Sequence, residues 1–280
     1  MSLAVFFFTF GLLCLQTTGF NTPRHYLKPH AWIEYSPHYR SSRISKLWGQ
    51  YSPYSSPPTD IPNSIPDQCS ITCIQILSRH GERHPIAHQE HRLRQTLNKI
   101  HNSVPGKSLM GKYQFLADYS YNLEANTLVP WGKQEMARSG RNFFERYRPL
   151  TANYTPFIRS THSPRVVESA DQFALGFHQA RLAFHGSPDP SYPYPKDVIS
   201  GDHNTLHHGL CTAFEQGTSK YDIKARDAYF NVFIPPIQQR LDTNLMGAKL
   251  SEQDAVRMMD LCPFSTVASS NGASKSYCKR

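Results

Sequence analysis

The stretch CSITCIQILSRHGERHP, residues 69–85, decides the fold. Its first part, residues 69–77, is apolar and rich in β-branched side chains, which predicts a short buried strand. Its second part, residues 78–85, holds two arginines and two histidines. Side chains that can all carry positive charge repel one another at such short spacing, and an anion bound among them would relieve that repulsion. We therefore expect an anion site directly after the strand.

The residues of this loop suit phosphate chemistry. Arg79 and Arg83 carry planar guanidinium groups, which match phosphate oxygens two at a time. His80 lies between them, and its Nε2 can attack phosphorus when it is unprotonated. Gly81 allows the backbone close to the anion, and Pro85 stiffens the end of the loop. A solvated basic turn is the simpler interpretation, which a lone Arg-His-Gly tripeptide would favour.

A second strand, arginine and helix follow in the same order. Apolar residues predict a strand that ends at Ile158, and Arg159 is then placed as a third guanidinium clamp. Ser163 caps the next helix, and Pro164 occupies its first position. Strands that lead through arginine-bearing loops into helices predict an α/β fold with the site at the strand tips.

Most of the remaining chain is predicted to be helical. Apolar residues at helical spacing, or a capping pattern, predict helices over four ranges: 88–101, 132–147, 223–245 and 252–261. Pro235 and Pro236 interrupt the third of these helices. Residues 186–210, which are rich in Pro, Gly and His, are predicted to be a loop.

The N-terminus resembles a secretory signal peptide. Its apolar stretch, from Leu3 to Leu15, is too short to cross a membrane comfortably, and small residues allow cleavage after Gly19. A signal anchor is the alternative. We expect residues 1–19 to be removed, and the mature protein to be secreted, extracellular and free of the membrane.

Composition and charge limit the remaining possibilities. Hydrophobic residues make up 39% of the 280 residues and charged residues 18%, which indicates a globular protein. Residues 20–67, rich in Pro, Ser and Tyr, are expected to form an extended arm, and residues 68–280 the folded domain. The net charge of +9 favours an anionic partner such as a phosphorylated small molecule. Basic residues are spread along the chain without a recognition motif, so we expect no nucleic acid as partner.

Secretion makes the cysteines disulfide candidates and Asn153 a glycosylation site. Five cysteines remain when Cys14 is removed with the signal peptide, so either one thiol stays free or partners are missing. Asn153 begins the only sequon, Asn-Tyr-Thr, and should lie on an exposed turn.

The pattern Arg-His-Gly-x-Arg-x-Pro at residues 79–85 resembles that of the histidine acid phosphatases. The stretches SKLWGQYSPY, PFIRST and VFIPPIQQRL are similar to the fungal phytase branch of this family, and the resemblance runs from about Ile44 to the last residue. It implies an α/β domain, with a mixed sheet flanked by helices, beside a smaller helical domain. It also implies phosphate release from myo-inositol hexakisphosphate (phytate) at acid pH, through a phosphohistidine and without a metal or other cofactor.

The resemblance also implies individual roles for residues of this sequence. His80 would be the nucleophile. The substrate would be bound by Gln50, Tyr51, Arg79, Arg83 and Arg159.

The resemblance further suggests how the cysteines pair. Cys262 and Cys278 resemble a local disulfide of the family. Cys69 and Cys211 match positions whose partners would lie beyond the last residue. Cys73 is additional, and we expect it to be a buried thiol.

One part of the family pattern is missing from this sequence. The family completes its site with a His-Asp pair, whose Asp protonates the leaving alcohol. Here Asp202 and His203 stand in the reverse order and in a different place. We therefore expect a fold that is incomplete at its C-terminus, and a chain that is unstable and at most weakly active. Ile86 also replaces a hydroxyl residue of the family, which leaves the preference for phytate open.

Two alternatives to a phytase remain. A broad-specificity acid phosphatase would use the same nucleophile, whereas a non-catalytic phosphate binder would keep the arginines without the proton donor. A metal site is not expected, because the histidine pairs at 84/88 and 203/207 have no third ligand at zinc spacing.

Overall fold

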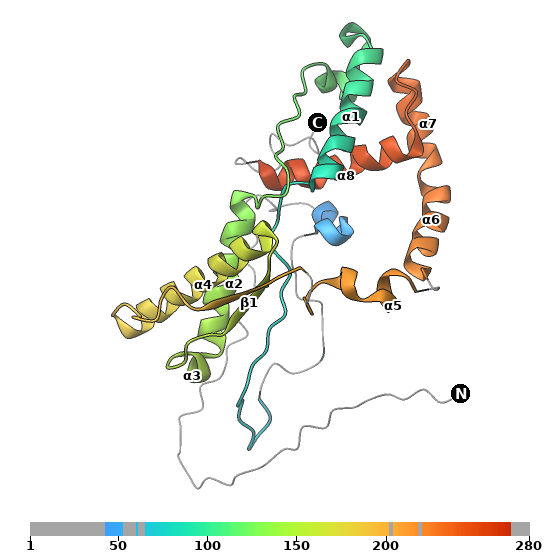
Figure 1. The fold of residues 1–280 in the computed structure, drawn as a ribbon. Helices are drawn as coiled ribbons and strands as arrows, with labels where there is room; N and C mark the ends of the chain where they lie inside the picture. The colour runs from blue at the N-terminus through green and yellow to red at the C-terminus, as the bar shows by residue number, and fades with distance from the viewer. Residues whose placement is uncertain (1–42, 53–59, 61–64, 202–203, 218–219, 270–280) are drawn as a thin grey trace, which may run out of the picture.

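The computed structural model describes residues 43–52, 60, 65–201, 204–217 and 220–269 (Figure 1). The predicted signal peptide, most of the predicted arm, and Asp202, His203 and Cys278 lie outside the described residues. None of the described helices is both long and apolar enough to cross a membrane.

Helices form most of the regular structure of the described chain. The α-helices are α1 (Ala87–Ser103), α2 (Pro130–Arg146), α3 (Arg148–Thr151), α4 (Pro164–His185), α5 (Thr212–Glu215), α6 (Tyr221–Phe233), α7 (Pro235–Asn244) and α8 (Glu252–Ala268). The 3-10 helices are η2 (Arg43–Leu47), η3 (Gly49–Tyr51), η4 (Gly106–Ser108), η5 (Gly111–Ala117) and η6 (His208–Leu210). The strands are β1 (Ile158–Thr161) and β2 (Lys196–Ile199).

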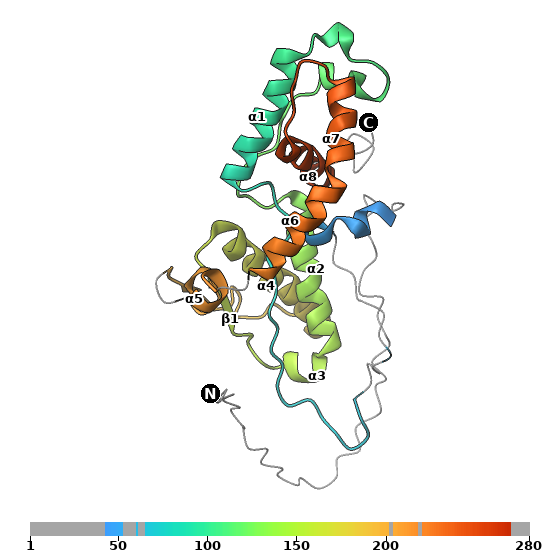
Figure 2. The same cartoon turned by 90° about the vertical axis from the view of Figure 1, so that its right-hand side faces the viewer.

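One hydrophobic cluster, which we call the helical core, joins α1, α7 and α8 at one end of the molecule (Figure 2). Its fully buried side chains include Ile100 of α1, Leu116 of η5 and Leu261 of α8. Burying a side chain of this kind contributes about 1.5–3 kcal/mol. Leu93 and Leu97 lie with Ile100 on the buried face of α1, as their helical spacing predicts.

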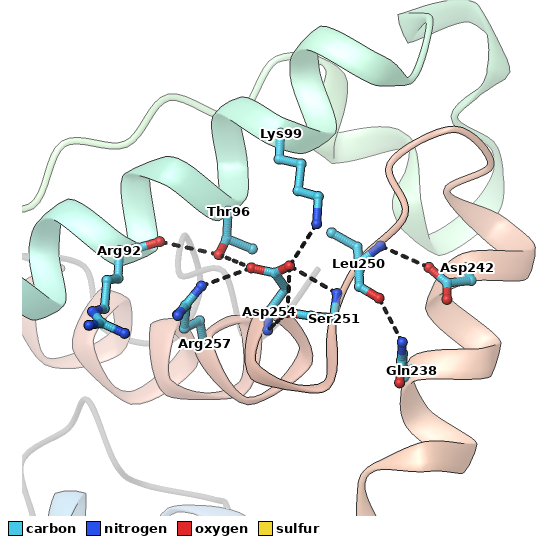
Figure 3. Close-up of polar contacts among 9 residues, drawn as sticks. All are labelled: Arg92, Thr96, Lys99, Gln238, Asp242, Leu250, Ser251, Asp254 and Arg257. Carbon is cyan, nitrogen blue, oxygen red and sulfur yellow. Dashed lines mark hydrogen bonds and ion pairs between the residues drawn. The ribbon is translucent and has the colours of Figure 1, made fainter.

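A buried carboxylate ties α1 to α8 within the helical core (Figure 3). Thr96 Oγ1 donates a 2.8 Å hydrogen bond to Oδ1 of Asp254, and Lys99 Nζ lies 2.9 Å from Oδ2. Arg257 Nη1 donates to Oδ1 at 2.9 Å. The Ser251 hydroxyl accepts from the backbone N–H of Asp254, whose carboxylate accepts from the N–H of Ser251. These two bonds form a capping box at the start of α8, in agreement with the helix predicted from residue 252.

A second cluster, the α/β core, packs α2 against α4 beside the strands (Figure 1). The helices cross closely because Gly140 of α2 and Gly176 of α4 have no side chains. A Cβ on either glycine would overlap a backbone carbonyl of the other helix. Phe144 and Phe177 fill the interface edge to face, with ring centroids 5.3 Å apart.

The two described strands pair in parallel, with Arg159 of β1 opposite Asp197 of β2. β2 lies within residues 186–210, so the prediction of a loop is wrong for Lys196–Ile199. This strand is held by its ladder to β1, which is distant in sequence and invisible to local composition. β1 begins at Ile158, where the predicted strand ends.

The apolar run at residues 69–77 is neither helix nor strand. Ile76 is 53% exposed and Leu77 is 86% exposed. A strand needs a neighbour to pair its backbone groups, and within the described residues the sheet consists of β1 and β2. The prediction of a buried strand is therefore wrong for this structure.

Several predicted helices are observed with shifted ends. The helices predicted over 88–101 and 132–147 are α1 and α2. The helix predicted over 223–245 begins two residues earlier, at Tyr221, and breaks into α6 and α7 at Pro235, as expected. Proline sets this boundary because it lacks the N–H that a continuous helix would need.

Two helix ends differ in detail from the prediction. α4 begins at Pro164, but the side chain of Ser163 makes no capping hydrogen bond. α8 continues to Ala268, past the predicted end at residue 261 and through Pro263. Pro263 and Phe264 are buried, so their packing outweighs the hydrogen bond that the proline removes.

Candidate active site

The loop that bears the paired arginines and histidines lies between the two cores. Gly81 packs on the first turn of α2, where a Cβ would overlap the carbonyl of Gly132. Its backbone N–H donates a 3.0 Å hydrogen bond to Oγ of Ser169 on α4. On the other side, the guanidinium of Arg83 lies 6.0 Å from the ring centroid of Phe264 on α8. Gly81 was expected to let the backbone approach an anion, and the structure shows that close packing against α2 also requires a glycine here.

A backbone carbonyl sets the tautomer of His80, which is partly buried. Its Nδ1 lies 2.8 Å from the carbonyl oxygen of Gly81, which can only accept, so Nδ1 carries the proton. Nε2 is then unprotonated whenever the ring is neutral. Burial lowers the pKa of the ring to about 4, and the charges of Arg79, Arg83 and Arg165 act in the same direction. Above that pH the imidazole offers a free lone pair.

Arg79 and Arg83 differ in their exposure and in the protein groups that they contact. Arg79 is exposed, and its Nη1 donates a 2.7 Å hydrogen bond to the backbone carbonyl of Gln50. Arg83 is partly buried, and its Nη1 donates to the carbonyl of His84 at 2.8 Å. The buried Nε of Arg83 has no hydrogen-bond partner among the described residues. Burial, followed by repulsion from neighbouring arginines, lowers the pKa of Arg83 to about 10. A bound anion would supply both an acceptor and a counter-charge.

Arg165, in the first turn of α4, is a third arginine beside this histidine. Its charge lowers the pKa of both His80 and Arg83. Its buried Nε lacks a hydrogen-bond partner within the part of the chain that the structure describes. The sequence reasoning missed this residue. A signal existed, because Arg165 follows Ser163 and Pro164 at a helix start, where anions are favoured.

Arg159, the predicted third clamp, is held by other partners. Its Nε lies 2.9 Å from Oδ2 of Asp197, and its guanidinium lies 5.2 Å from the ring centroid of Phe157. Arg159 is the second residue of β1 rather than the residue after it, so it stands opposite Asp197 in the ladder. Arg165, six residues after Arg159, is the arginine of this segment whose charge lowers the pKa of His80.

The two residues expected to line the substrate pocket lie beside the loop. The carbonyl of Gln50 accepts from Arg79, and the ring of Tyr51 lies 4.9 Å from that of Phe264. Burial raises the pKa of Tyr51, and the nearby carboxylate of Asp260 acts in the same direction. Burial also raises the pKa of Asp260, to about 6. No sequence motif marks Asp260, and only the packing of α8 reveals it.

Three cysteines of the described chain, Cys69, Cys73 and Cys211, are free and exposed. The expectation of a buried thiol at Cys73 is therefore wrong, because the run that contains it is not packed as a strand. Cys278 lies outside the described residues, so its pairing with Cys262 stays a prediction.

Two expectations about the surface can be compared with the structure. Asn153 is exposed in a bend that follows α3, which confirms its predicted setting, while glycosylation itself stays a prediction. Across the described ranges, no three histidine, cysteine or acidic side chains are grouped so that they could hold a metal ion.

Comparison with known proteins agrees with the motif. Residues 70–277 match the Histidine phosphatase superfamily (branch 2), and the chain belongs to this family. It is 39% identical over 241 residues to a Phytase A of Aspergillus oryzae, covering 84% of this chain and 51% of that protein. It is 39% identical over 240 residues to a Phytase A of Neurospora crassa, covering 81% of this chain and 46% of that protein.

A solved structure supports the fold. The crystal structure of the phytase from D. castellii matches with a TM-score of 0.59 at 20% identity, covering 74% of this chain and 46% of that one. This likeness concerns the fold alone, and it confirms the predicted α/β class. The chain spans about half the length of the curated relatives it matches.

Proposed function

We propose that this chain is a secreted phosphoric monoester hydrolase that forms a phosphohistidine at His80. The observation that carries the proposal is an imidazole whose Nδ1–H is held by Gly81, in the field of three arginines. Membership in the histidine phosphatase superfamily and similarity to proteins named Phytase A support the same reaction.

The reaction would proceed in two displacements at phosphorus. Nε2 of His80 attacks, so that an N–P bond forms while the P–O bond to the alcohol breaks. Arg79, Arg83 and Arg165 would hold the non-bridging oxygens and stabilise the charge that builds on them. Water then attacks phosphorus, the N–P bond breaks, and inorganic phosphate leaves with the imidazole restored.

Protonation of the leaving alcohol limits the proposed rate. General acid catalysis typically contributes about 10²–10⁴-fold, and no His-Asp dipeptide occurs in the sequence. We therefore propose slow turnover of alkyl phosphates and faster turnover of esters whose leaving group needs no proton.

Hydrolysis of p-nitrophenyl phosphate tests the nucleophile, because nitrophenolate leaves without a general acid. We expect turnover that is lost in His80→Ala and kept in His185→Ala, since His185 lies in the last turn of α4. Turnover that survives in His80→Ala would refute the proposed intermediate.

A non-catalytic phosphate binder is the second candidate, since the buried Nε atoms of Arg83 and Arg165, which have no partner among the described residues, could bind phosphate without any proton donor. Such a protein would bind inorganic phosphate, measured by calorimetry, without hydrolysing p-nitrophenyl phosphate. Within the enzyme class, phytate is the proposed substrate because the relatives are named Phytase A. Equal rates on phytate and on a simple sugar phosphate would indicate a broad-specificity acid phosphatase instead.

Secretion is proposed from the apolar N-terminus and the exposed sequon. Expression of the full chain in a fungal host should release it into the medium with a glycan at Asn153. A glycosidase shift that is present in the unmodified chain and absent in Asn153→Gln would establish the modification.

A further inference from the structure

Three consecutive hydrogen bonds connect α4 to the imidazole of His80. The hydroxyl of Ser169 donates to the carbonyl oxygen of Arg165 at 2.7 Å. The same Oγ accepts from the backbone N–H of Gly81 at 3.0 Å. The carbonyl oxygen of Gly81 then accepts from Nδ1–H of His80 at 2.8 Å.

Ser169 is suited to this place because a hydroxyl both donates and accepts. Its donation to Arg165, four residues earlier in the helix, directs the free lone pairs of Oγ away from that carbonyl. Ser169 is 3% exposed and Gly81 is also buried, so water does not compete for the N–H of Gly81. A buried N–H without an acceptor is strongly disfavoured. The pairing therefore specifies where Gly81 lies.

Gly81 is held on a second side by α2. A Cβ at this position would overlap the carbonyl of Gly132, so the backbones of the loop and of α2 are in direct contact. The N–H of Gly81 is held by Ser169, and its Cα lies against Gly132. The peptide that follows is also held, because the carbonyl of Glu82 accepts a 3.0 Å hydrogen bond from the backbone at the start of α2, so the carbonyl of Gly81 has little freedom to turn. That carbonyl is the group that keeps the proton on Nδ1 of His80.

We propose that Ser169 is a positioning residue, which orients Gly81 so that His80 keeps its proton on Nδ1 and presents Nε2 as a free lone pair. Arg165 lies one helical turn before Ser169, so α4 both supplies an arginine beside His80 and orients its imidazole. The kinetic consequence rests on the proposed function, whereas the effect on the tautomer does not.

The tautomer is measured directly by nitrogen NMR of the chain labelled with ¹⁵N-histidine, at about pH 7. In the unmodified chain we expect a protonated Nδ1 and an unprotonated Nε2 at His80. In Ser169→Ala the two shifts should move toward each other as both tautomers are populated, and Ser169→Thr, which keeps the hydroxyl, should restore them. A folded Ser169→Ala variant with an unchanged tautomer would overturn the proposal.

Ser160→Ala is the matched control. Ser160 is 1% exposed on β1, and its Oγ has no hydrogen-bond partner in the described chain. Its removal should leave the His80 signals unchanged, and equal changes in both variants would show a general packing effect and so refute the specific role of Ser169.

Two further measurements separate this proposal from the proposed function. If Ser169→Ala does not fold, hydrogen exchange of the Gly81 amide in the unmodified chain decides. Slow exchange supports the bond to Ser169, and exchange at the rate of an exposed amide refutes it.

On p-nitrophenyl phosphate, kcat should fall about 10- to 100-fold in Ser169→Ala with little change in KM. Absent turnover in the unmodified chain counts against the proposed function, while the tautomer still decides the role of Ser169.

Discussion

Thr96 Oγ1 on α1 donates a 2.8 Å hydrogen bond to Oδ1 of Asp254 on α8, which joins residues 158 positions apart in the chain. Lys99 and Arg257 supply positive charge to the same buried carboxylate. Because its removal would leave the donors of Thr96, Lys99, Arg257 and Ser251 without their acceptor, Asp254→Ala should lower the free energy of unfolding by about 3 kcal/mol. Urea unfolding at about pH 7 measures this loss. The exposed control Asp118→Ala should change stability by less than about 0.5 kcal/mol, and equal effects would contradict the role of Asp254.

The contribution of Asp254 should persist in acid. Burial alone would raise the pKa of its carboxyl, but the hydrogen bonds from Ser251, Lys99 and Thr96 outweigh burial and lower it. A carboxyl whose folded pKa is lowered stabilises the protein above its unfolded pKa of about 3.9, and this stability is lost as the pH falls through the folded pKa. The loss caused by Asp254→Ala should therefore be the same at about pH 5 as at about pH 7. A loss that disappears at about pH 5 would contradict the lowered pKa.

The contact between α2 and α4 should not tolerate a side chain at Gly176. A Cβ there would overlap the backbone of α2, which cannot move as a flexible side chain can. We expect Gly176→Ala to destabilise the protein by about 3 kcal/mol, seen as a lower Tm. Gly106→Ala is the control, because its Cβ would make only ordinary contact with Ala117. A Tm for Gly176→Ala equal to that of the control would show that the helices can separate without loss.

The free energy of unfolding should depend on His80 in mild acid. Burial lowers the folded pKa of His80 to about 4, while the unfolded value is about 6.5. Between these values the unfolded state binds more protons, so the stability contributed by neutral His80 is present above about pH 6.5 and is lost as the pH falls toward about 4. His80→Ala should therefore flatten the rise in stability over that window in urea titrations. An unchanged slope would show that His80 is not shifted.

Phosphate affinity should distinguish Arg165 from Arg159. Arg165 acts on His80, and its buried Nε has no hydrogen-bond partner among the residues that the structure describes, whereas Arg159 is paired with Asp197. A charge-assisted hydrogen bond contributes about 1.5–3 kcal/mol, so Arg165→Ala should weaken phosphate binding at least about tenfold in calorimetry. Arg159→Ala should change it less than about threefold. The reverse order would restore Arg159 as the third clamp.

The elements that sequence predicts well are those set by local chemistry. The spacing of Leu93, Leu97 and Ile100 specifies the buried face of α1, and Pro235 breaks α6 from α7 because it cannot donate a backbone hydrogen bond. The strand predicted over residues 69–77 was not found, and β2 was not predicted. Strand formation depends on a neighbour that lies elsewhere in the chain, so a local apolar pattern does not determine it.

The sequence by itself determined that His80 stands between Arg79 and Arg83, because these residues are covalent neighbours in one loop. It also indicated where α4 and α8 begin, at Pro164 and Glu252, since helix starts depend on nearby residues. Only the tertiary structure decided which distant groups lie beside this loop: the charge of Arg165 acts on His80 while Arg159 pairs with Asp197, and Ser169 accepts from the N–H of Gly81. The physical reason is that Arg159 meets its counter-charge in a strand formed 38 positions later, and Gly81 meets its acceptor 88 positions later. Such pairings exist only when the helices and strands have packed.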